Sequence, residues 1–256
     1  MPIRWDNLHV GWIAHHVAKP KARLRLFTFP YGGGGASIFK EWSNALPDEI
    51  EVCPVQLPGR EDRSRETPCT KMSSLIHELT TALTSFADLP FAFFGHSMGA
   101  LIAFELARQL GSIRGRLLHV FVSSCRAAHT FTGGLGRHLL SDSQLVHEMR
   151  RLGTPEQVLH NNDLLSYVLP VMRADFELVD TYSYTPGLPL HCELSAYGAA
   201  ADVEVSTDDL LSWSQHTDAG FHVRVFEGNH FYLRTRVPSL IAAILTDMVG
   251  HLPSKP

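Results

Sequence analysis

The stretch FAFFGHSMGALIAFELARQL, residues 91–110, predicts a strand, a sharp turn and a helix in direct succession. FAFF is a short apolar run of the kind that forms a buried strand, and residues 98–110 are rich in strong helix formers. The turn between them is GHSMG, a GxSxG pattern centred on Ser97. Between a strand and a helix this pattern is typical of a nucleophile elbow, which exposes a serine hydroxyl at the carboxyl edge of a sheet. The alternative is an ordinary helix N-terminus capped by a serine.

The same alternation of apolar runs and helical patterns continues on both sides of this stretch. Strands are predicted at residues 24–29, 52–57, 91–94, 117–122, 193–197 and 223–226. Helices are predicted at residues 71–87, 98–110 and 238–252, and Gly111 should end the second of them. Strands separated by helices imply parallel βαβ units. We therefore expect an α/β fold, with a mostly parallel central sheet flanked by helices. Pro54 argues against the second strand or places it at the sheet edge.

The composition excludes several other classes of protein. The chain has 256 residues, 45% of them hydrophobic and 19% charged, and a formal net charge of −4. This mild acidity provides no general attraction to nucleic acid or to an anionic membrane. No apolar run approaches the roughly 18 residues of a membrane span, and the N-terminus lacks the apolar core of a secretory signal. The cysteines (Cys53, Cys69, Cys125 and Cys192) form no CxxC pair, so we expect reduced thiols and a cytoplasmic protein.

A serine hydroxyl is a weak nucleophile until a base removes its proton, and the base should follow a late strand. Of fifteen histidines, His230 is the best placed, because it follows the last predicted strand and a Glu-Gly-Asn turn. His216 and His222 lie nearby, but His216 falls in a polar helix or loop and His222 begins the strand. We therefore expect His230 to be the general base.

The carboxylate that orients the base should follow the preceding strand, in the order serine, acid, histidine. Asp202 comes soon after the strand at 193–197 and is our first candidate. Asp208 is the runner-up, although Asp208 and Asp209 resemble first-turn residues of a helix.

Acyl transfer also needs backbone N–H groups that stabilise an oxyanion. Met98, the residue after the nucleophile candidate, should supply one of them. The second should come from the Tyr-Gly-Gly-Gly-Gly loop after the first strand, because glycines allow the backbone to approach a substrate closely. Gly32 is the first candidate and Gly33 the next. This loop matches neither phosphate-binding pattern, GxxxxGK[ST] or GxGxxG.

Residues 125–192 connect two consecutive predicted strands, far more than the dozen or so residues of an ordinary crossover. Helical patterns at 142–152, 155–159 and 164–182 indicate that this insertion has its own structure. Ser97 precedes it, whereas the histidine and aspartate candidates follow it. We therefore expect one core, residues 1–125 and 187–256, with residues 126–186 inserted as a helical unit.

Taken together, these motifs resemble the α/β-hydrolase family, and more narrowly the type II thioesterases of polyketide, fatty-acid and nonribosomal-peptide synthases. The resemblance covers nearly the whole chain, and its most particular motifs are QLPGRE at 56–61 and LPVMRADFELVDTY at 169–182. The chain departs from the family pattern in two places. Gly32 stands where the family often has alanine, and Asn229 stands where a glycine is common.

The resemblance implies an editing thioesterase, which clears stalled or misprimed acyl groups from carrier proteins. Ser97 would be acylated, with His230 as base and Asp202 as acid, and Met98 and Gly32 would form the oxyanion hole. The insertion would be a lid over an acyl pocket. Its candidate pocket residues are Met149, Leu152, Tyr167, Met172 and Phe176. We expect no cofactor and no metal, a monomer, and acyl or peptidyl carrier proteins as partners, with acyl-CoA as a further substrate.

Two other functions fit the same residues. A carboxylesterase or lipase would use the same catalytic groups on oxoesters, and a non-catalytic protein would only bind the carrier. Because carrier proteins are usually acidic, a basic rim would aid their encounter. The candidates are Arg60, Arg63, Arg65, Arg150 and Arg151. The alternative is that these arginines are solvated or form ion pairs with Glu61, Asp62 and Glu66.

Overall fold

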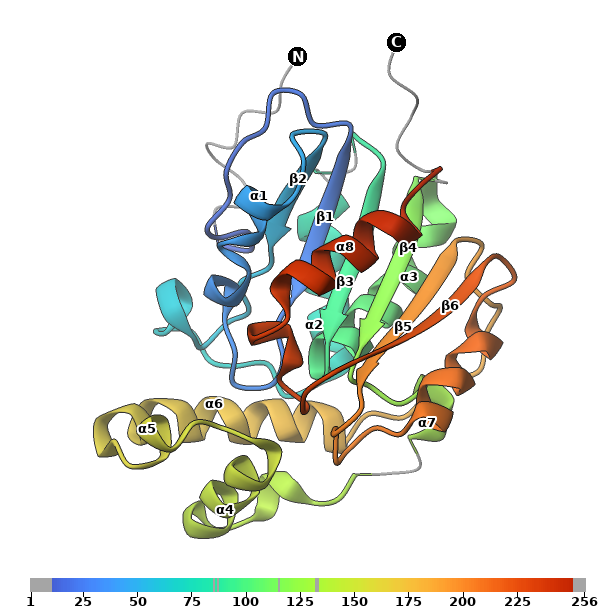
Figure 1. Ribbon diagram of the computed structural model, residues 1–256. Helices are drawn as coiled ribbons and strands as arrows, with labels where there is room; N and C mark the ends of the chain where they lie inside the picture. Colours follow the sequence, from blue (N-terminus) through green and yellow to red (C-terminus); the bar gives the residue numbers. More distant parts are fainter. Residues whose placement is uncertain (1–10, 85, 87, 115, 132–133, 251–256) are drawn as a thin grey trace.

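The computed structural model describes residues 11–84, 86, 88–114, 116–131 and 134–250, and its centre is a six-stranded sheet (Figure 1). The strands are β1 (Leu24–Phe29), β2 (Ile50–Pro54), β3 (Phe91–His96), β4 (Leu117–Ser123), β5 (Glu193–Ala199) and β6 (Phe221–Phe226). Their order in the sheet is β2-β1-β3-β4-β5-β6, and every neighbouring pair is parallel. The α/β fold expected from the sequence is confirmed, and β2 with its Pro54 lies at an edge.

Helices cover both faces of the sheet. They are α1 (Trp42–Ala45), α2 (Met72–Thr84), α3 (Met98–Arg114), α7 (Thr207–Leu211) and α8 (Val237–Asp247). The short 3-10 helices are η1 (Ala36–Phe39), η2 (Glu61–Arg63), η3 (Ala128–Thr130), η4 (Arg137–Leu139), η5 (Ser212–His216) and η6 (Tyr232–Arg234). Side chains alternate along each strand. In β1, Phe27 and Phe29 therefore pack with α2 and α3, whereas Leu24 and Leu26 pack with α1 and α8.

The predicted end of α3 is wrong, because the helix continues through Gly111 to Arg114. One glycine costs a helix only about 1 kcal/mol relative to alanine. The preceding turns of α3 are buried against β1, β3 and β4, and this packing exceeds that cost.

The insertion between β4 and β5 forms a group of three helices on one side of the molecule (Figure 1). They are α4 (Asp142–Leu152), α5 (Glu156–Leu159) and α6 (Asn162–Asp180). The α4 helix has the predicted bounds, because Ser141 and Gln144 form a capping box and Gly153 ends the helix in a left-handed conformation. The three helices share a small apolar core around Leu145, Met149 and Phe176.

The sheet topology places two loops beside each other. The chain runs from β1 outward to β2 and returns to β3 on the other side of β1, so the strand order reverses between β1 and β3. Ligands bind at the carboxyl ends of strands at such a switch point. Phe29 at the end of β1 is the register neighbour of Gly95 in β3. The glycine loop after β1 and the turn after β3 therefore meet at one edge.

Within the described residues, no helix combines the length and apolar character needed to cross a bilayer. All four cysteines are free thiols, and Cys53, Cys125 and Cys192 are buried.

The contact between α3 and β1 leads to the first prediction. A Cβ on Gly99 would lie 2.2 Å from the carbonyl oxygen of Phe29, so Gly99→Ala forces two backbone segments apart. We expect a loss of at least about 2–3 kcal/mol in the free energy of unfolding, measured by urea denaturation. Gly136→Asn is the control, since that position has a φ of 67° and open space around it, and it should change stability by less than about 0.5 kcal/mol. Equal stability of the two variants would contradict the close contact.

Candidate active site

Ser97 lies on a strained turn directly after β3. Its φ is 53°, in the left-handed region that few non-glycine residues adopt. Its backbone N–H donates to the carbonyl of Ser123 in β4 at 2.7 Å, which ties the turn to the neighbouring strand. A Cβ on Gly95 would lie 2.0 Å from the carbonyl oxygen of Gly99, so the turn closes only with glycine there. The sequence pattern therefore forms the expected strand–turn–helix geometry.

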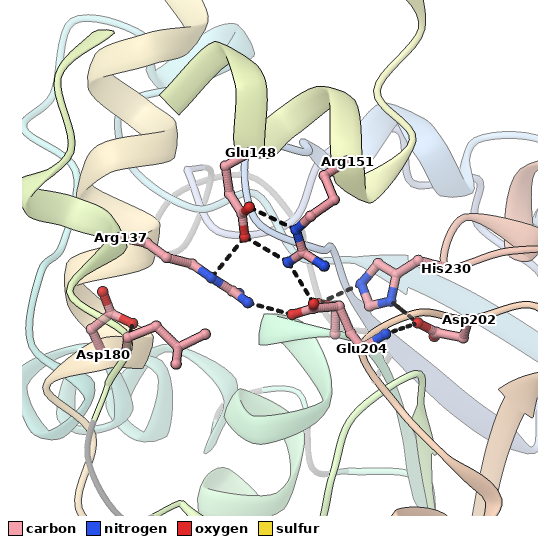
Figure 2. Close-up of polar contacts among 9 residues, drawn as sticks. Arg137, Glu148, Arg151, Asp180, Asp202, Glu204 and His230 are labelled. Carbon is pink, nitrogen blue, oxygen red and sulfur yellow. Dashed lines mark hydrogen bonds and ion pairs between the residues drawn. The ribbon is translucent and has the colours of Figure 1, made fainter. Parts of the chain in front are cut away.

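The structure brings Ser97, His230 and Asp202 into one chain of hydrogen bonds. Ser97 Oγ lies 3.0 Å from His230 Nε2. His230 Nδ1 lies 2.9 Å from Asp202 Oδ2 and 3.1 Å from Oδ1, and Figure 2 shows the two side chains pointing toward one another. The Asp202 side chain is fully buried, and the His230 side chain is nearly so. The three residues follow β3, β5 and β6, at the same edge of the sheet.

Asp202 is held as a carboxylate. Burial alone would raise its pKa, but the hydrogen bonds from His230 and from the Glu204 N–H bring the pKa below its ordinary value. The runner-up, Asp208, is an exposed residue in the first turn of α7. His222 is exposed and faces Glu193, and His216 pairs with His129 through ring nitrogens 2.8 Å apart. These three candidates are therefore not part of the chain of hydrogen bonds.

A second hydrogen-bonded chain holds the backbone of His230. The ring Nε2 of His96 lies 2.8 Å from the carbonyl oxygen of His230 and must donate to it, which leaves Nδ1 to accept from Ser123 Oγ. Tyr232 OH in turn donates to Ser123 Oγ at 2.7 Å. Sequence reasoning missed this role of His96, because its only signal was a position within the GHSMG motif. Burial, together with a smaller effect of the neighbouring His230, lowers the pKa of His96 to about 3.

The turn before His230 has its positive φ at Gly228 and not at Asn229, the position where the family commonly has glycine. The left-handed residue is Gly228, with a φ of 122°, and Asn229 is not among the residues with positive φ. Asn229 Oδ1 instead accepts from the Phe231 N–H at 3.0 Å, as in an Asx turn.

Most N–H groups of the loop after β1 already have acceptors. Gly33 donates to Asp175 Oδ2 at 2.6 Å, Gly34 donates to the carbonyl of Tyr31, and Ala36 donates to Gln56 Oε1. Across the described chain, no acceptor is assigned to the N–H of Gly32, which lines the same pocket as Ser97 and Met98. The two loop candidates therefore differ, because only the Gly32 N–H is available to a ligand.

The space around this loop explains why alanine can stand at the position of Gly32, as it often does in the family. A Cβ on Gly32 would meet Asp175 Cβ at 3.7 Å, an ordinary contact. A Cβ on Gly33 would lie 2.7 Å from Met172 Cε, and the φ of Gly33 is 76°. Glycine is therefore needed at Gly33 but not at Gly32.

The expectation that Arg60 belongs to an exposed basic rim is wrong. Its side chain is buried and forms two hydrogen bonds to Asp175 of α6, at 2.7 and 2.8 Å. Arg63 pairs with Glu66, as the alternative predicted. Arg65 is exposed.

The other two rim candidates also form ion pairs, and those of Arg151 belong to a network beside the catalytic candidates. Arg150 pairs with Glu156 on α5. Arg151 pairs with Glu148 and with Glu204, and Arg137 pairs with the same two acids. Figure 2 shows Glu204 between these two arginines on one side and His230 and Asp202 on the other. The network joins the insertion to the loop that carries Asp202.

The site opens into a cavity of about 140 Å³ between the sheet edge and the insertion. Of the proposed pocket residues, Leu152, Met172 and Phe176 line it. Met149 instead packs in the core of the insertion, and the Tyr167 hydroxyl accepts from the Glu61 N–H at 2.7 Å. The insertion thus contributes apolar side chains to the wall facing Ser97.

Among the described residues, one group has metal-ligand types close together, namely His16, Glu51 and Cys53. Glu51 already accepts from Arg25 at 2.7 Å, and burial raises the pKa of the Cys53 thiol well above its ordinary value. A protonated thiol and a paired carboxylate make this donor set a poor fit for a metal ion.

The burial of His96 leads to a prediction on pH. Folded His96 stays neutral down to about pH 3, whereas an imidazole in the unfolded chain takes up a proton near pH 6.5. As the pH falls from 6.5 toward 3, the unfolded state therefore gains a proton that the folded state does not, and stability falls. His96→Gln keeps one donor and one acceptor but does not titrate. Between pH 6 and 4.5, the unfolding free energy of the wild type should fall more steeply than that of this variant by about 1.4 kcal/mol per pH unit. Urea denaturation measures both slopes, and equal slopes would show that His96 is not the group responsible.

The chain resembles known proteins over nearly its whole length. A family model described as a thioesterase domain matches residues 24–248. The gramicidin S biosynthesis protein GrsT of Aneurinibacillus migulanus is 42% identical over 224 residues, which are 87% of this chain and 88% of that protein.

Solved structures show the same relationship. The type II thioesterase BorB from the borrelidin biosynthetic cluster superimposes with a TM-score of 0.86 at 37% identity, covering 96% of this chain and 100% of that one. The RedJ thioesterase from the prodiginine pathway of Streptomyces coelicolor superimposes with a TM-score of 0.82 at 40% identity, covering 88% of this chain and 85% of that one. The chain therefore belongs to the thioesterase family and is a serine hydrolase that acts on thioesters.

Proposed function

We propose that Ser97 is the nucleophile, His230 the general base and Asp202 the carboxylate that orients the base. The observation that carries this proposal is the unbroken chain of hydrogen bonds from Ser97 Oγ through His230 to the buried Asp202. Because Asp202 accepts from Nδ1, it selects the tautomer in which Nε2 is free to take the serine proton. Asp202 also stabilises the imidazolium that forms during the reaction.

We propose the N–H groups of Met98 and Gly32 as the oxyanion hole. Both residues line the cavity into which Ser97 opens. Of the two loop candidates, Gly32 has the available N–H, since that of Gly33 donates to Asp175. Met98 begins α3, a helix of 17 residues, so the positive end of the helix dipole is directed at the same place.

The reaction then has two steps. Ser97 Oγ bonds to the thioester carbonyl carbon while its proton passes to His230, and the carbonyl oxygen becomes an oxyanion held by the two N–H groups. The carbon–sulfur bond breaks, and the proton moves from His230 to the departing thiolate. Water then attacks the acyl-serine, gives a proton to His230, and that proton returns to Ser97 as the acid is released. A thiol with a pKa near 8.5 leaves readily, so thioesters need little acid assistance.

We propose that the thioesters are acyl groups on the phosphopantetheine arm of acyl or peptidyl carrier proteins, and that the enzyme removes aberrant groups there. The support is that the relatives belong to pathways for gramicidin S, borrelidin and prodiginine. Acyl-CoA presents the same thiol and is a second substrate. We further propose that the enzyme is a cytoplasmic monomer and that the reaction needs no cofactor. The four free thiols are consistent with a reducing compartment.

We also propose that residues 126–186 are a lid on a core formed by residues 1–125 and 187–256. The support is that side chains of α4 and α6 form one wall of the cavity, whereas Ser97 and His230 from the core form the other.

Ser97→Ala tests the nucleophile. It should lower kcat for hydrolysis of acyl-carrier thioesters by about 10³-fold or more, because only binding and the oxyanion hole remain. The readout is intact-protein mass spectrometry of the carrier, with thermal unfolding as a control for folding. Asp202→Asn should lose about 10³- to 10⁴-fold, and Asp208→Asn should lose less than twofold. Full activity of Ser97→Ala would show that the protein acts without this serine, as a carrier binder.

The leaving group distinguishes a thioesterase from a general esterase. With the same acyl chain, we expect kcat/KM for the pantetheine thioester to exceed that for the matching oxoester by at least about tenfold, because the thiolate is the better leaving group. The measurement is initial rate against substrate concentration for both compounds. A faster oxoester reaction would instead assign the site to a carboxylesterase.

A further inference from the structure

Arg60 and Asp175 form a buried ion pair between the core and the insertion. Arg60 Nη1 lies 2.7 Å from Asp175 Oδ2, and Nη2 lies 2.8 Å from Oδ1, so the guanidinium meets the carboxylate with two parallel hydrogen bonds. The two residues are 3% and 2% exposed. They come from QLPGRE and LPVMRADF, the two most particular motifs of the sequence, and neither takes part in the chain of hydrogen bonds at Ser97.

The pair also holds the glycine loop from both sides. Asp175 Oδ2 accepts the N–H of Gly33 at 2.6 Å, and Arg60 Nη1 donates to the carbonyl of Gly34 at 3.2 Å. With its donor and acceptor both engaged, this part of the loop has one orientation. Gly32, one residue earlier, lines the cavity together with Ser97.

A buried ion pair is a costly way to attach a helix. Desolvation of the two charges offsets much of their attraction, and apolar side chains of the same volume often stabilise a protein as well. The α6 helix already has such apolar contacts, since Met172 and Phe176 on either side of Asp175 are buried. Attachment of α6 therefore does not by itself explain the pair, whereas the orientation of a polar loop requires polar partners.

We propose that Asp175, held by Arg60, is a positioning residue for the oxyanion hole. It removes the Gly33 N–H from the site and fixes the loop so that the Gly32 N–H is directed at the thioester oxygen. This inference rests on the proposed role of Gly32. On this basis the inserted helix α6 is a part of the catalytic apparatus as well as a wall of the pocket.

Two double variants test the proposal. Arg60→Met with Asp175→Asn removes the charges but keeps an amide oxygen that accepts the Gly33 N–H. Arg60→Met with Asp175→Leu removes the charges and the acceptor at a similar volume. We expect kcat for an acyl-pantetheine thioester to be about 10²-fold lower in the leucine pair than in the asparagine pair. We expect KM to agree within about twofold, because the oxyanion forms only in the transition state.

Thermal unfolding of both pairs separates positioning from stability, since a purely structural role would lower the melting temperature without the split between kcat and KM. Arg173→Gln is the matched control. It lies on the same helix and holds only the insertion, through the carbonyls of His138 and Leu140 and through Asp142, so kcat should not change. If the leucine pair does not fold, Arg60→Met with Asp175→Ala replaces it, with the same expected loss.

Equal kcat values for the acceptor and non-acceptor pairs would overturn the proposal. If the wild type is active and Ser97→Ala is inactive, that result leaves the thioesterase mechanism standing and rejects only the positioning role. A wild type that hydrolyses none of the thioesters would instead reject the proposed function itself.

Discussion

The backbone contact between the first turn of α3 and the end of β1 is the constraint on which the site depends. With a glycine at position 99, the helix approaches the carbonyl of Phe29 so closely that no side chain fits between them. This contact fixes the turn in which Ser97 has its positive φ. Because Phe29 and Gly95 are neighbours in the sheet register, the same contact brings the glycine loop beside the serine. Two parallel strands and one turn thus place the nucleophile candidate and its proposed oxyanion donors.

The features that could be predicted from the sequence are the local ones. The strand at 24–29 and the helix at 142–152 follow from an apolar run and from capping residues, and the GxSxG turn follows from its two glycines. The order of the strands along the chain was enough to select His230 and Asp202 from many other histidines and acids. All of these signals depend on residues within a few positions of one another, or on chain order in a parallel sheet.

The features that could not be predicted depend on contacts between distant residues. Arg60 and Asp175 are 115 positions apart, and an arginine among charged neighbours is usually exposed, so nothing local indicated a buried pair. The role of His96 depends on Ser123 in β4 and on the carbonyl of His230, which only the folded sheet brings near. The predicted end of α3 was wrong for the opposite reason. There a local signal, Gly111, was outweighed by tertiary packing.

The insertion is joined to the core by two kinds of electrostatic contact, and they differ in strength. At α6 the contact is a fully buried pair, and separating such a pair costs about 3–5 kcal/mol. At α4 it is the network of Arg137, Glu148, Arg151 and Glu204, whose side chains are between 15% and 40% exposed, so water screens these charges more than those of the buried pair. The two contacts therefore differ in how far they are shielded from water, whereas α4 and α6 share one apolar core.

The buried contact at α6 agrees with the way in which the backbone N–H groups of the glycine loop are satisfied. A buried N–H without an acceptor costs about 1–3 kcal/mol, and the loop after β1 satisfies those of Gly33, Gly34 and Ala36 within the protein. On the proposed assignment, the Gly32 and Met98 N–H groups remain for the substrate, and their cost is recovered when the oxyanion forms. Donors of this kind accelerate a reaction only if they do not relax toward other acceptors in the free enzyme. On our proposal, the Arg60–Asp175 pair prevents that relaxation on one side of the loop, and the first turn of α3 prevents it on the other. On this proposal, the buried attachment of α6 serves the chemistry as well as the wall of the pocket.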